Sequence, residues 1–314
     1  MRAVTITDEI LSVQDRATPL PESGCVLVAV AGAGLNGADI MQRRGLYPAP
    51  PGWPVDVPGL EFAGTIEALG PDVEGFRVGD RVMGIVGGGA QASHVTTDAT
   101  TLLRVPDSLD LVVAGGFPEA FTTAFDAIVN QGFLLPGERL LVTGAAGGVG
   151  TAAIQIGRLL GADVTASVRD LSRRDELVAL GANRVVNPDD VKDAGPYDVV
   201  VELVGAASLT NGVLAALNEF ARVVVIGVGG GTKAEVNLLG MMAGRITLTG
   251  STLRARSREE KAGIAAAMKQ VLLPALAEGT LSVPVLARYS LDTVNEAYER
   301  FSAGSKLGKI ILEV

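Results

Sequence analysis

The second half of the chain alternates short apolar runs with segments whose apolar residues recur at helical spacing. The first apolar run begins at Leu140, and further runs follow at Asp163–Val168, Arg184–Val186, Asp198–Val201, Arg222–Ile226 and Ile246–Thr249. Helical spacing is found at Thr151–Leu160, Ser172–Leu180 and Ala207–Leu217. The alternation predicts an α/β fold with a doubly wound, mostly parallel sheet, whose ligand lies at the carboxyl ends of the strands.

The first third has a different pattern, in which alternating apolar and polar residues are interrupted by clusters of glycine and proline. The alternating runs, which predict a small β-barrel, are Arg2–Ile6, Cys25–Ala31, Glu61–Leu69 and Arg81–Val86. A long helix at Ser257–Glu278 and an alternating tail at Lys309–Leu312 are expected to return to this barrel. We therefore predict a nucleotide-binding domain, residues 121–254, inserted between residues 1–120 and 255–314 of a barrel domain.

Composition narrows the class of protein. At 314 residues the chain has the length of about two domains. Its net charge of −9 argues against a generally basic surface for nucleic acid or anionic lipid. No apolar run reaches the ~18 residues of a membrane-spanning helix, and the first residues lack a signal-peptide core. The single cysteine, Cys25, allows no internal disulfide and is expected in the core. We expect a cytoplasmic protein.

A glycine-rich loop follows the apolar run that begins at Leu140. Its pattern, Ala145-x-Gly147-x-x-Gly150, differs by one residue from the dinucleotide-binding pattern G-x-G-x-x-G. The alternative is a turn that only packs a helix closely on a strand. The surrounding alternation of strands and helices favours nucleotide binding. The backbone expected to hold the pyrophosphate, at the N-terminus of a helix, is that of Ala146, Gly147, Gly148, Val149 and Gly150.

Several segments resemble the medium-chain dehydrogenase/reductases, and among them the zinc-free quinone oxidoreductases. The matching segments are AGLNGADIMQRRGLYP from Ala33, GLEFAG from Gly59, VGDRV from Val78, FPEAFTTA from Phe117, GAAGGVGTAAIQ from Gly144, GSTLRARS from Gly250 and LGKIIL from Leu307. They are most similar to zeta-crystallin-like members, in particular the p53-inducible type. The resemblance implies a chaperonin-10-like (GroES-like) barrel, a Rossmann domain and an active site in the cleft between them.

The zinc ligands of related dehydrogenases are missing from this sequence. In the zinc-dependent relatives the first ligand is a cysteine before Gly and Asp, and the second is the histidine of G-H-E. The corresponding residues here are Asn36 and Leu60. The only histidine, His94, is expected at the surface or at the barrel edge. We therefore predict that no metal takes part.

Without a metal, the cofactor supplies most of the chemistry. A nicotinamide hydride passes readily to acceptors that are already polarised, namely quinones and α,β-unsaturated carbonyls, whereas a simple ketone needs a Lewis acid or a proton donor. The prediction is an NADPH-dependent reductase of a small-molecule quinone. Alternatives are an enone, enal or enoyl-thioester reductase and a non-catalytic NADPH-binding protein.

The resemblance also implies roles for individual residues. Asn36 and Tyr47 are the expected catalytic residues, hydrogen-bonding the cofactor or the acceptor oxygen. The alternatives are that Asn36 caps the next helix and that Tyr47 only packs. Asp39 is expected to bind the backbone, and Thr123 to meet the nicotinamide unless it is merely buried. Further nicotinamide contacts, at the ends of two predicted strands, are expected from Gly227, Val228, Gly229, Ser251, Thr252 and Leu253.

The end of the second strand of the nucleotide domain decides between NADPH and NADH. Arg173 takes the place of the family's phosphate-binding lysine, and Arg169 adds a second cation. Asp170 and Pro188, which replaces a family tyrosine, point the other way. We expect NADPH. The alternative is NADH, and the arginines would then lie at the start of a solvent-exposed helix without binding a phosphate. The resemblance and the apolar Ile246–Leu248 segment suggest a homodimer formed by strand pairing.

Overall fold

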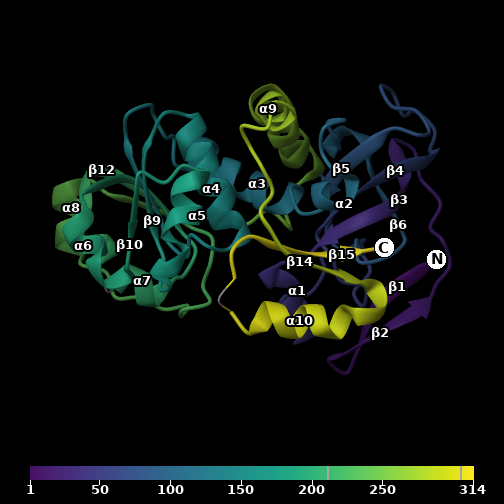
Figure 1. Cartoon of the computed structure of the whole chain (residues 1–314), viewed down its shortest axis with the longest axis horizontal. Helices are drawn as coiled ribbons and strands as arrows, with labels where there is room; N and C mark the ends of the chain where they lie inside the picture. The colour runs from purple at the N-terminus through teal and green to yellow at the C-terminus, as the bar shows by residue number, and fades with distance from the viewer. Residues whose placement is uncertain (211, 305) are drawn as a thin grey trace. The chain divides into compact units, whose positions relative to one another are not determined.

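The computed structural model describes residues 1–210, 212–304 and 306–314. The chain divides into two compact units. Unit 1 contains residues 1–122 and 253–314, and unit 2 contains residues 123–252. Figure 1 labels the elements of both units. Unit 1 therefore takes its strands from both ends of the chain.

Unit 2 is built on a six-stranded parallel sheet with the order β10-β9-β8-β11-β12-β13. Its strands are β8 (Arg139–Val142), β9 (Asp163–Ser167), β10 (Arg184–Val186), β11 (Tyr197–Glu202), β12 (Leu217–Val225) and β13 (Thr247–Gly250). The valines of the central strand β11 are fully buried, as expected for a sheet covered on both faces. The predicted doubly wound sheet is confirmed, and its topological switch lies between β8 and β11.

The helices of unit 2 are α4 (Gly148–Leu159), α5 (Arg174–Leu180), α6 (Val191–Ala194), α7 (Ala206–Thr210) and α8 (Leu238–Gly244). The helix predicted at Ala207–Leu217 is wrong, because α7 ends at Thr210 and β12 already begins at Leu217. Position 211 of that prediction lies outside the described residues. Leu217 pairs with Tyr197 of β11, so sheet pairing outweighs helical spacing here.

Unit 1 contains a seven-stranded sheet, in the order β14-β15-β3-β4-β5-β7 with β6 paired to β3, and a separate β1-β2 hairpin. The strands are β1 (Arg2–Thr7), β2 (Ile10–Asp15), β3 (Cys25–Gly34), β4 (Glu61–Leu69), β5 (Arg81–Ile85), β6 (His94–Asp98), β7 (Leu103–Arg104), β14 (Val285–Ser290) and β15 (Lys309–Glu313). Strand β15 runs antiparallel to β3, with Ile311 opposite Gly34. The tail predicted to return to the barrel does so.

The helices of unit 1 surround this sheet. They are α1 (Gly37–Arg43), α2 (Leu111–Ala114), α9 (Arg258–Ala277) and α10 (Val294–Ser302), together with most of α3 (Pro118–Phe125), in which the boundary between the units falls. Helix α9 begins with a capping box, since Ser257 and Glu260 exchange hydrogen bonds with each other's backbone. None of the described helices combines the length and hydropathy that a membrane crossing requires.

Short non-α segments join these elements. They are the 3-10 turns Ala99–Thr101, Leu171–Arg173, Pro188–Asp190, Val213–Ala215 and Leu291–Thr293, and a π-helical segment, Asp126–Gln131.

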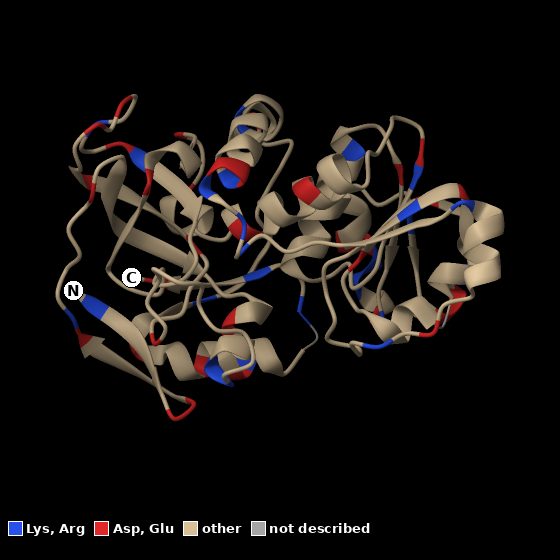
Figure 2. Cartoon of the chain, turned by 180° about the vertical axis from the view of Figure 1, so that it is seen from behind, with Lys and Arg blue, Asp and Glu red and all other residues tan. Residues whose placement is uncertain are grey.

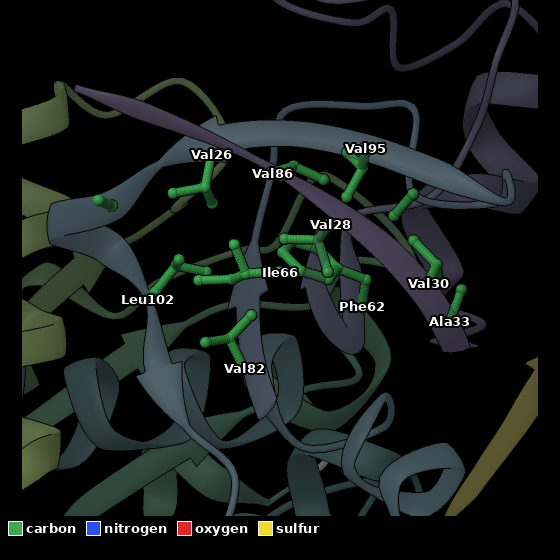
Figure 3. Close-up of a cluster of buried hydrophobic side chains, with 12 residues drawn as sticks. Val26, Val28, Val30, Ala33, Phe62, Ile66, Val82, Val86, Val95 and Leu102 are labelled. Atoms are coloured by element: carbon green, nitrogen blue, oxygen red, sulfur yellow. The ribbon is translucent and has the colours of Figure 1, made fainter. Parts of the chain in front are cut away.

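The core of unit 1 lies between the strands of its large sheet. Figure 3 shows the cluster, in which Val28, Phe62 and Leu102 are fully buried and point toward one another. Trp53, the only tryptophan of the chain, packs against it. Cys25 opens β3 beside this core but is half-buried, so the expectation that it lies fully in the core is wrong. The first residue of the strand faces Asp98 of β6, where the sheet ends.

Candidate active site

The glycine-rich loop joins β8 to α4 at the carboxyl edge of the parallel sheet. Gly147 is the N-cap residue of α4, so the N–H groups of the first helical turn point out of the helix end. An added Cβ at Gly147 meets only the Gly144 carbonyl, at 3.6 Å, so a ligand can approach the bare backbone closely. At Gly150 a Cβ would lie 2.5 Å from the Ala145 carbonyl oxygen. The two glycines therefore serve different purposes, one toward a ligand and one in packing. A pyrophosphate group fits this helix N-terminus.

A buried carboxylate fixes the backbone at the topological switch. Glu202, at the end of β11, is fully buried. Its Oε1 accepts hydrogen bonds from the Thr143 hydroxyl at 2.8 Å and from the N–H groups of Val204 and Gly205 at 2.7 and 2.8 Å. Thr143 ends the neighbouring strand run, so this one side chain ties two strand ends together. Sequence reasoning missed Glu202; its position at the end of a valine run was the available signal.

The other predicted cofactor residues of unit 2 lie at the same edge, because the carboxyl ends of parallel strands meet there. Gly227 follows β12 and donates its N–H to the Glu202 carbonyl at 3.1 Å. Ser251 follows β13, and its hydroxyl donates to Asp126 at 3.1 Å. Val228 and Gly229 continue the turn after β12, and Thr252 ends unit 2. Leu253 is buried and belongs to unit 1.

The turn after β9 presents the two arginines expected at the cofactor's ribose. Arg169 is exposed, and Arg173 is half-buried. The Arg173 guanidinium donates to Glu176 at 3.1 Å, and its Nε lies 3.9 Å from Asp170, buried and without a hydrogen bond among the described residues. Asp170 itself accepts hydrogen bonds from Ser172. Arg173 is thus paired with acidic neighbours at the start of a helix, whereas Arg169 is exposed.

In unit 1 a buried ion pair lies beside Asn36. Lys309, which opens β15, is 4% exposed, and Glu61, which opens β4, is fully buried. The Lys309 ammonium donates to the Glu61 carboxylate, to Asn36 Oδ1 at 2.7 Å and to the Leu35 carbonyl at 3.1 Å. Gly34 makes room for this pair, because a Cβ there would lie 2.2 Å from Glu61 Oε1.

The side chain of Asn36 is committed to this ion pair. Its amide nitrogen donates to Glu61 Oε1 at 2.9 Å and to the Gly34 carbonyl at 3.2 Å. Both amide hydrogens are therefore used within unit 1, and donation to a ligand would require Asn36 to release one of them. Asn36 also stands at the N-cap position of α1, where its backbone N–H donates to Asp39 at 2.8 Å.

Asp39 has the structural role that the sequence suggested. Its other oxygen accepts the N–H of Gly59 at 3.0 Å, so it joins α1 to the segment before β4. Burial raises the pKa of Asp39 to about 6, and the two N–H donors oppose that rise.

Glu119, in the first turn of α3, adds a second carboxyl to this cluster. Its backbone N–H donates to Glu61 Oε2 at 2.8 Å, but its side chain is only half-buried. Burial and the nearby Glu61 carboxylate raise the pKa of Glu119 to about 8, against the opposing charges of Lys309 and Lys261. Sequence reasoning did not select Glu119. An acid among apolar residues of a helix was the signal.

Tyr47 is held by Arg254, a third residue that sequence reasoning missed. Arg254 is 6% exposed and donates to the carbonyls of Tyr47 and Gly87, each at 2.8 Å, and to the Gln42 side chain. Its guanidinium carbon lies 4.9 Å from the centre of the Tyr47 ring. Burial lowers the pKa of the Arg254 guanidinium, and Asp39, Tyr47 and Glu119 oppose that shift. Asn36, Tyr47 and Glu119 therefore belong to one polar region of unit 1.

This region does not fit a zinc ion. A catalytic zinc needs three protein ligands, and no group of three His, Cys, Asp or Glu side chains suitable for a metal is found in the part of the chain that the structure describes. Lys309 places an ammonium on the Glu61 carboxylate instead. His94 lies on β6, where its Nε2 is 2.9 Å from Glu67.

Comparison with known proteins identifies the family. Residues 22–107 match the profile of the alcohol dehydrogenase GroES-like domain, and residues 148–269 match that of the zinc-binding dehydrogenases. Human quinone oxidoreductase is 31% identical over 99% of this chain and 97% of its own length. The chain belongs to the medium-chain dehydrogenase/reductases, in their quinone oxidoreductase group. It is therefore an oxidoreductase that uses a nicotinamide cofactor.

Other similar proteins include an alcohol dehydrogenase superfamily protein of known structure and a segment of a much longer synthase. An alcohol dehydrogenase superfamily protein from Novosphingobium aromaticivorans has a similar structure, with a TM-score of 0.88 and 28% identity, covering 100% of this chain and 99% of that one. A phenolphthiocerol/phthiocerol polyketide synthase of Mycobacterium tuberculosis is 30% identical over 98% of this chain, which matches 14% of the length of that synthase.

The two loop glycines yield the first prediction. Gly150→Ala forces a methyl group against the Ala145 backbone, so we expect unit 2 to lose about 1–3 kcal/mol of stability. Gly147→Ala is the matched control, because its methyl group meets no close neighbour. Thermal unfolding followed by circular dichroism checks the pair. Equal midpoints for the two variants would contradict the separate purposes assigned to these glycines.

The buried ion pair yields the second prediction. Lys309→Met leaves the Glu61 carboxylate without its cation and should cost about 3–5 kcal/mol. Adding Glu61→Gln should restore part of this loss. Urea unfolding followed by Trp53 fluorescence reports on unit 1, and Lys269→Met, at an exposed lysine of α9, is the control. A loss no larger than that of the control would show that the pair does not stabilise unit 1.

Proposed function

We propose that this protein reduces quinones, or other alkenes conjugated to a carbonyl, with hydride from NADPH and without zinc. The observation that carries the proposal is Asn36, which corresponds to the cysteine ligand of zinc-dependent relatives and is hydrogen-bonded to the Lys309–Glu61 ion pair. A site built in this way suits acceptors that are already polarised.

Unit 2 supplies the binding surface for the cofactor. The N–H groups from Ala146 to Gly150 hold the pyrophosphate, and Arg169 and Arg173 bind the 2′-phosphate. The exposed Arg169, with Arg173 beside it in the same turn, supports NADPH over NADH. Gly227 to Gly229 and Ser251 to Leu253 contact the nicotinamide through their backbones, and Thr123 lies beside it.

Unit 1 supplies the acceptor side. When bound, NADPH provides a hydride, that is, a proton together with two electrons. Tyr47, with its ring held by Arg254, binds the acceptor oxygen through its hydroxyl. Asn36 holds Glu61 and Lys309 in place through its two side-chain hydrogen bonds to them. The second lone pair of its Oδ1 can accept a hydrogen bond from a ligand. Near-attack positioning supplies most of the rate, because neither residue needs to form a covalent bond.

A second acceptor class is an enoyl thioester. The likeness to a segment of a polyketide synthase over 98% of this chain favours it. A purely cofactor-binding role remains the non-enzymatic alternative to turnover. The scattered charges argue against RNA as a partner in that case, since basic and acidic residues intermingle on both units (Figure 2).

The third prediction is the acceptor profile. We expect oxidation of NADPH, and more slowly of NADH, with quinones or enones but not with simple ketones. The double variant Arg169→Ala/Arg173→Ala should weaken NADPH binding about tenfold to a hundredfold and leave NADH unchanged, because only NADPH carries the 2′-phosphate. Absorbance of the reduced nicotinamide measures turnover. Tight NADPH binding without turnover of any acceptor would favour the non-catalytic role.

The fourth prediction concerns a second copy of the chain. Strand β13 is an edge strand, and α8 before it exposes Leu238, Leu239 and Met242 by 71%, 75% and 73%. We propose that two copies pair β13 edges and cover these side chains. Light scattering at micromolar concentration should give a dimer mass, and Leu248→Lys, on β13, should shift it toward the monomer. A monomer mass for the unmodified chain would contradict strand pairing.

A further inference from the structure

We propose that the Glu119 side chain is the proton donor to the acceptor, and that its physiological acceptor class is therefore an α,β-unsaturated carbonyl compound. This inference rests on the proposed function, and it names the acceptor class that this site serves. It assigns to a protein carboxyl the proton that would otherwise come from solvent or Tyr47.

Glu119 is held in place by its backbone and leaves its side chain for a ligand. The N–H of Glu119 donates to Glu61 Oε2 at 2.8 Å, which anchors the first turn of α3 to the buried ion pair. Glu61 also binds Asn36, so Glu119 and Asn36 share one carboxylate as a support. The Glu119 carboxyl itself is half-buried and, among the described residues, has neither a hydrogen bond nor an ion pair. A carboxyl placed in this way is available to a small molecule.

Burial and two neighbouring carboxylates favour the protonated form of Glu119. Burial raises the pKa of Glu119 most, Glu61 on β4 and Asp39 on α1 raise it further, and Lys309 on β15 and Lys261 on α9 lower it. The outcome is a pKa of about 8, so the carboxyl holds its proton at neutral pH. Lys261 is drawn away in part, since its ammonium donates to the Arg254 carbonyl at 2.9 Å.

Four other titratable groups of this region lack either access or a proton to give. Asp39 is fully buried and accepts two backbone N–H groups. Lys309 and Glu61 are sealed against each other, at 4% and 0% exposed. Arg254 stays charged and is bound to three acceptors. Glu119 alone among these combines partial exposure with a transferable proton.

The step balances for an enone. Hydride forms a C–H bond at the β-carbon, and the π electrons of the C=C bond move to the carbonyl oxygen to give an enolate. The α-carbon of the enolate then takes the proton from the Glu119 O–H, whose bonding electrons stay on the carboxylate. Solvent returns one proton to Glu119. The cofactor is oxidised by two electrons, and the alkene is reduced by two.

Quinones provide the internal comparison. Their reduction ends with protons on oxygen, which exchange rapidly with water, so a protein acid is not required. An enolate must be protonated on carbon, where transfer is slower and a positioned acid contributes about 10²–10⁴-fold. Loss of the Glu119 proton should therefore slow enone reduction much more than quinone reduction.

The fifth prediction tests this difference with Glu119→Gln, which keeps the shape of the side chain but cannot donate an acidic proton. We expect the kcat for an enone to fall about 10²–10⁴-fold and the kcat for a quinone to change less than about threefold. In the unmodified enzyme the enone kcat should fall as pH rises through about 8, because the proton is lost there, and this limb should vanish in the variant. Glu22→Gln, at an exposed residue of unit 1, is the matched control.

Two further measurements do not depend on the rate of turnover. Carbon-13 NMR of the unliganded protein, labelled at the glutamate carboxyls, should show one signal that titrates near pH 8 and is absent from Glu119→Gln. In deuterated water, the unmodified enzyme should place deuterium on one face of the α-carbon, and the variant should place it on both. Glu119→Asp, which keeps an acid one methylene shorter, should retain the high-pH limb with a reduced enone kcat.

The outcomes separate this inference from the proposed function. Turnover of quinones and enones that falls equally in Glu119→Gln would overturn the proton role while leaving hydride transfer intact. The same holds for a missing carbon-13 signal near pH 8, or for an unmodified enzyme that reduces quinones but no enone. Absence of turnover with every acceptor would instead overturn the proposed function, and the donor role with it.

Discussion

The buried ion pair between Lys309 and Glu61 is the interaction on which unit 1 depends. It joins residues 248 positions apart in the sequence, at the openings of β15 and β4. Removing two charges from water is costly, and the cost is offset here because both groups are fully hydrogen-bonded. The Glu61 carboxylate accepts hydrogen bonds from the Asn36 amide and the Glu119 backbone N–H. The Lys309 ammonium also donates to the Leu35 carbonyl. The pair therefore sets the positions of α1 and α3 as well as the two strands.

Unit 2 also contains a buried glutamate that organises the backbone near its centre. At the switch between β8 and β11, the segments that follow the two strands diverge and leave a crevice for a ligand. Backbone N–H groups beyond the strand ends have no strand partner there. Glu202 accepts those of Val204 and Gly205 and also binds Thr143. The strand ends are thereby rigid, while the α4 N-terminus keeps its N–H groups for an anion. Each unit thus uses one buried glutamate to shape the backbone beside its site.

Local patterns predicted most of the fold. The alternation at Glu61–Leu69 matches β4, and the long helix predicted at Ser257–Glu278 matches α9. The six strands of unit 2 were all predicted, and the central ones carry the strong apolar signal of parallel strands buried on both faces. The helix at Ala207–Leu217 failed because the start of β12 is decided by pairing with β11, which no local window contains. Helix α10 was missed although Val294, Ala297 and Tyr298 are spaced as on one face of a helix.

The candidate site could be predicted only where its residues lie close together in the sequence. The glycine spacing of the α4 loop is read within a few residues, and so are the arginines after β9. The polar region of unit 1 is different, because Asn36, Glu61, Glu119 and Lys309 come from separate segments and are defined by contacts between them. Sequence reasoning noticed that zinc ligands were missing, but not that Lys309 binds Asn36 and Glu61.

The make-up of this cluster carries a chemical consequence. A zinc ion would supply an open coordination position and so polarise an acceptor oxygen directly. The Lys309 ammonium is instead spent on Glu61, Asn36 and a backbone carbonyl, and leaves no comparable electrophile. What the cluster does retain is negative charge close to Glu119, which keeps a proton on that carboxyl. A site that polarises weakly but can protonate is suited to acceptors whose own conjugation activates them, and whose product needs a proton on carbon.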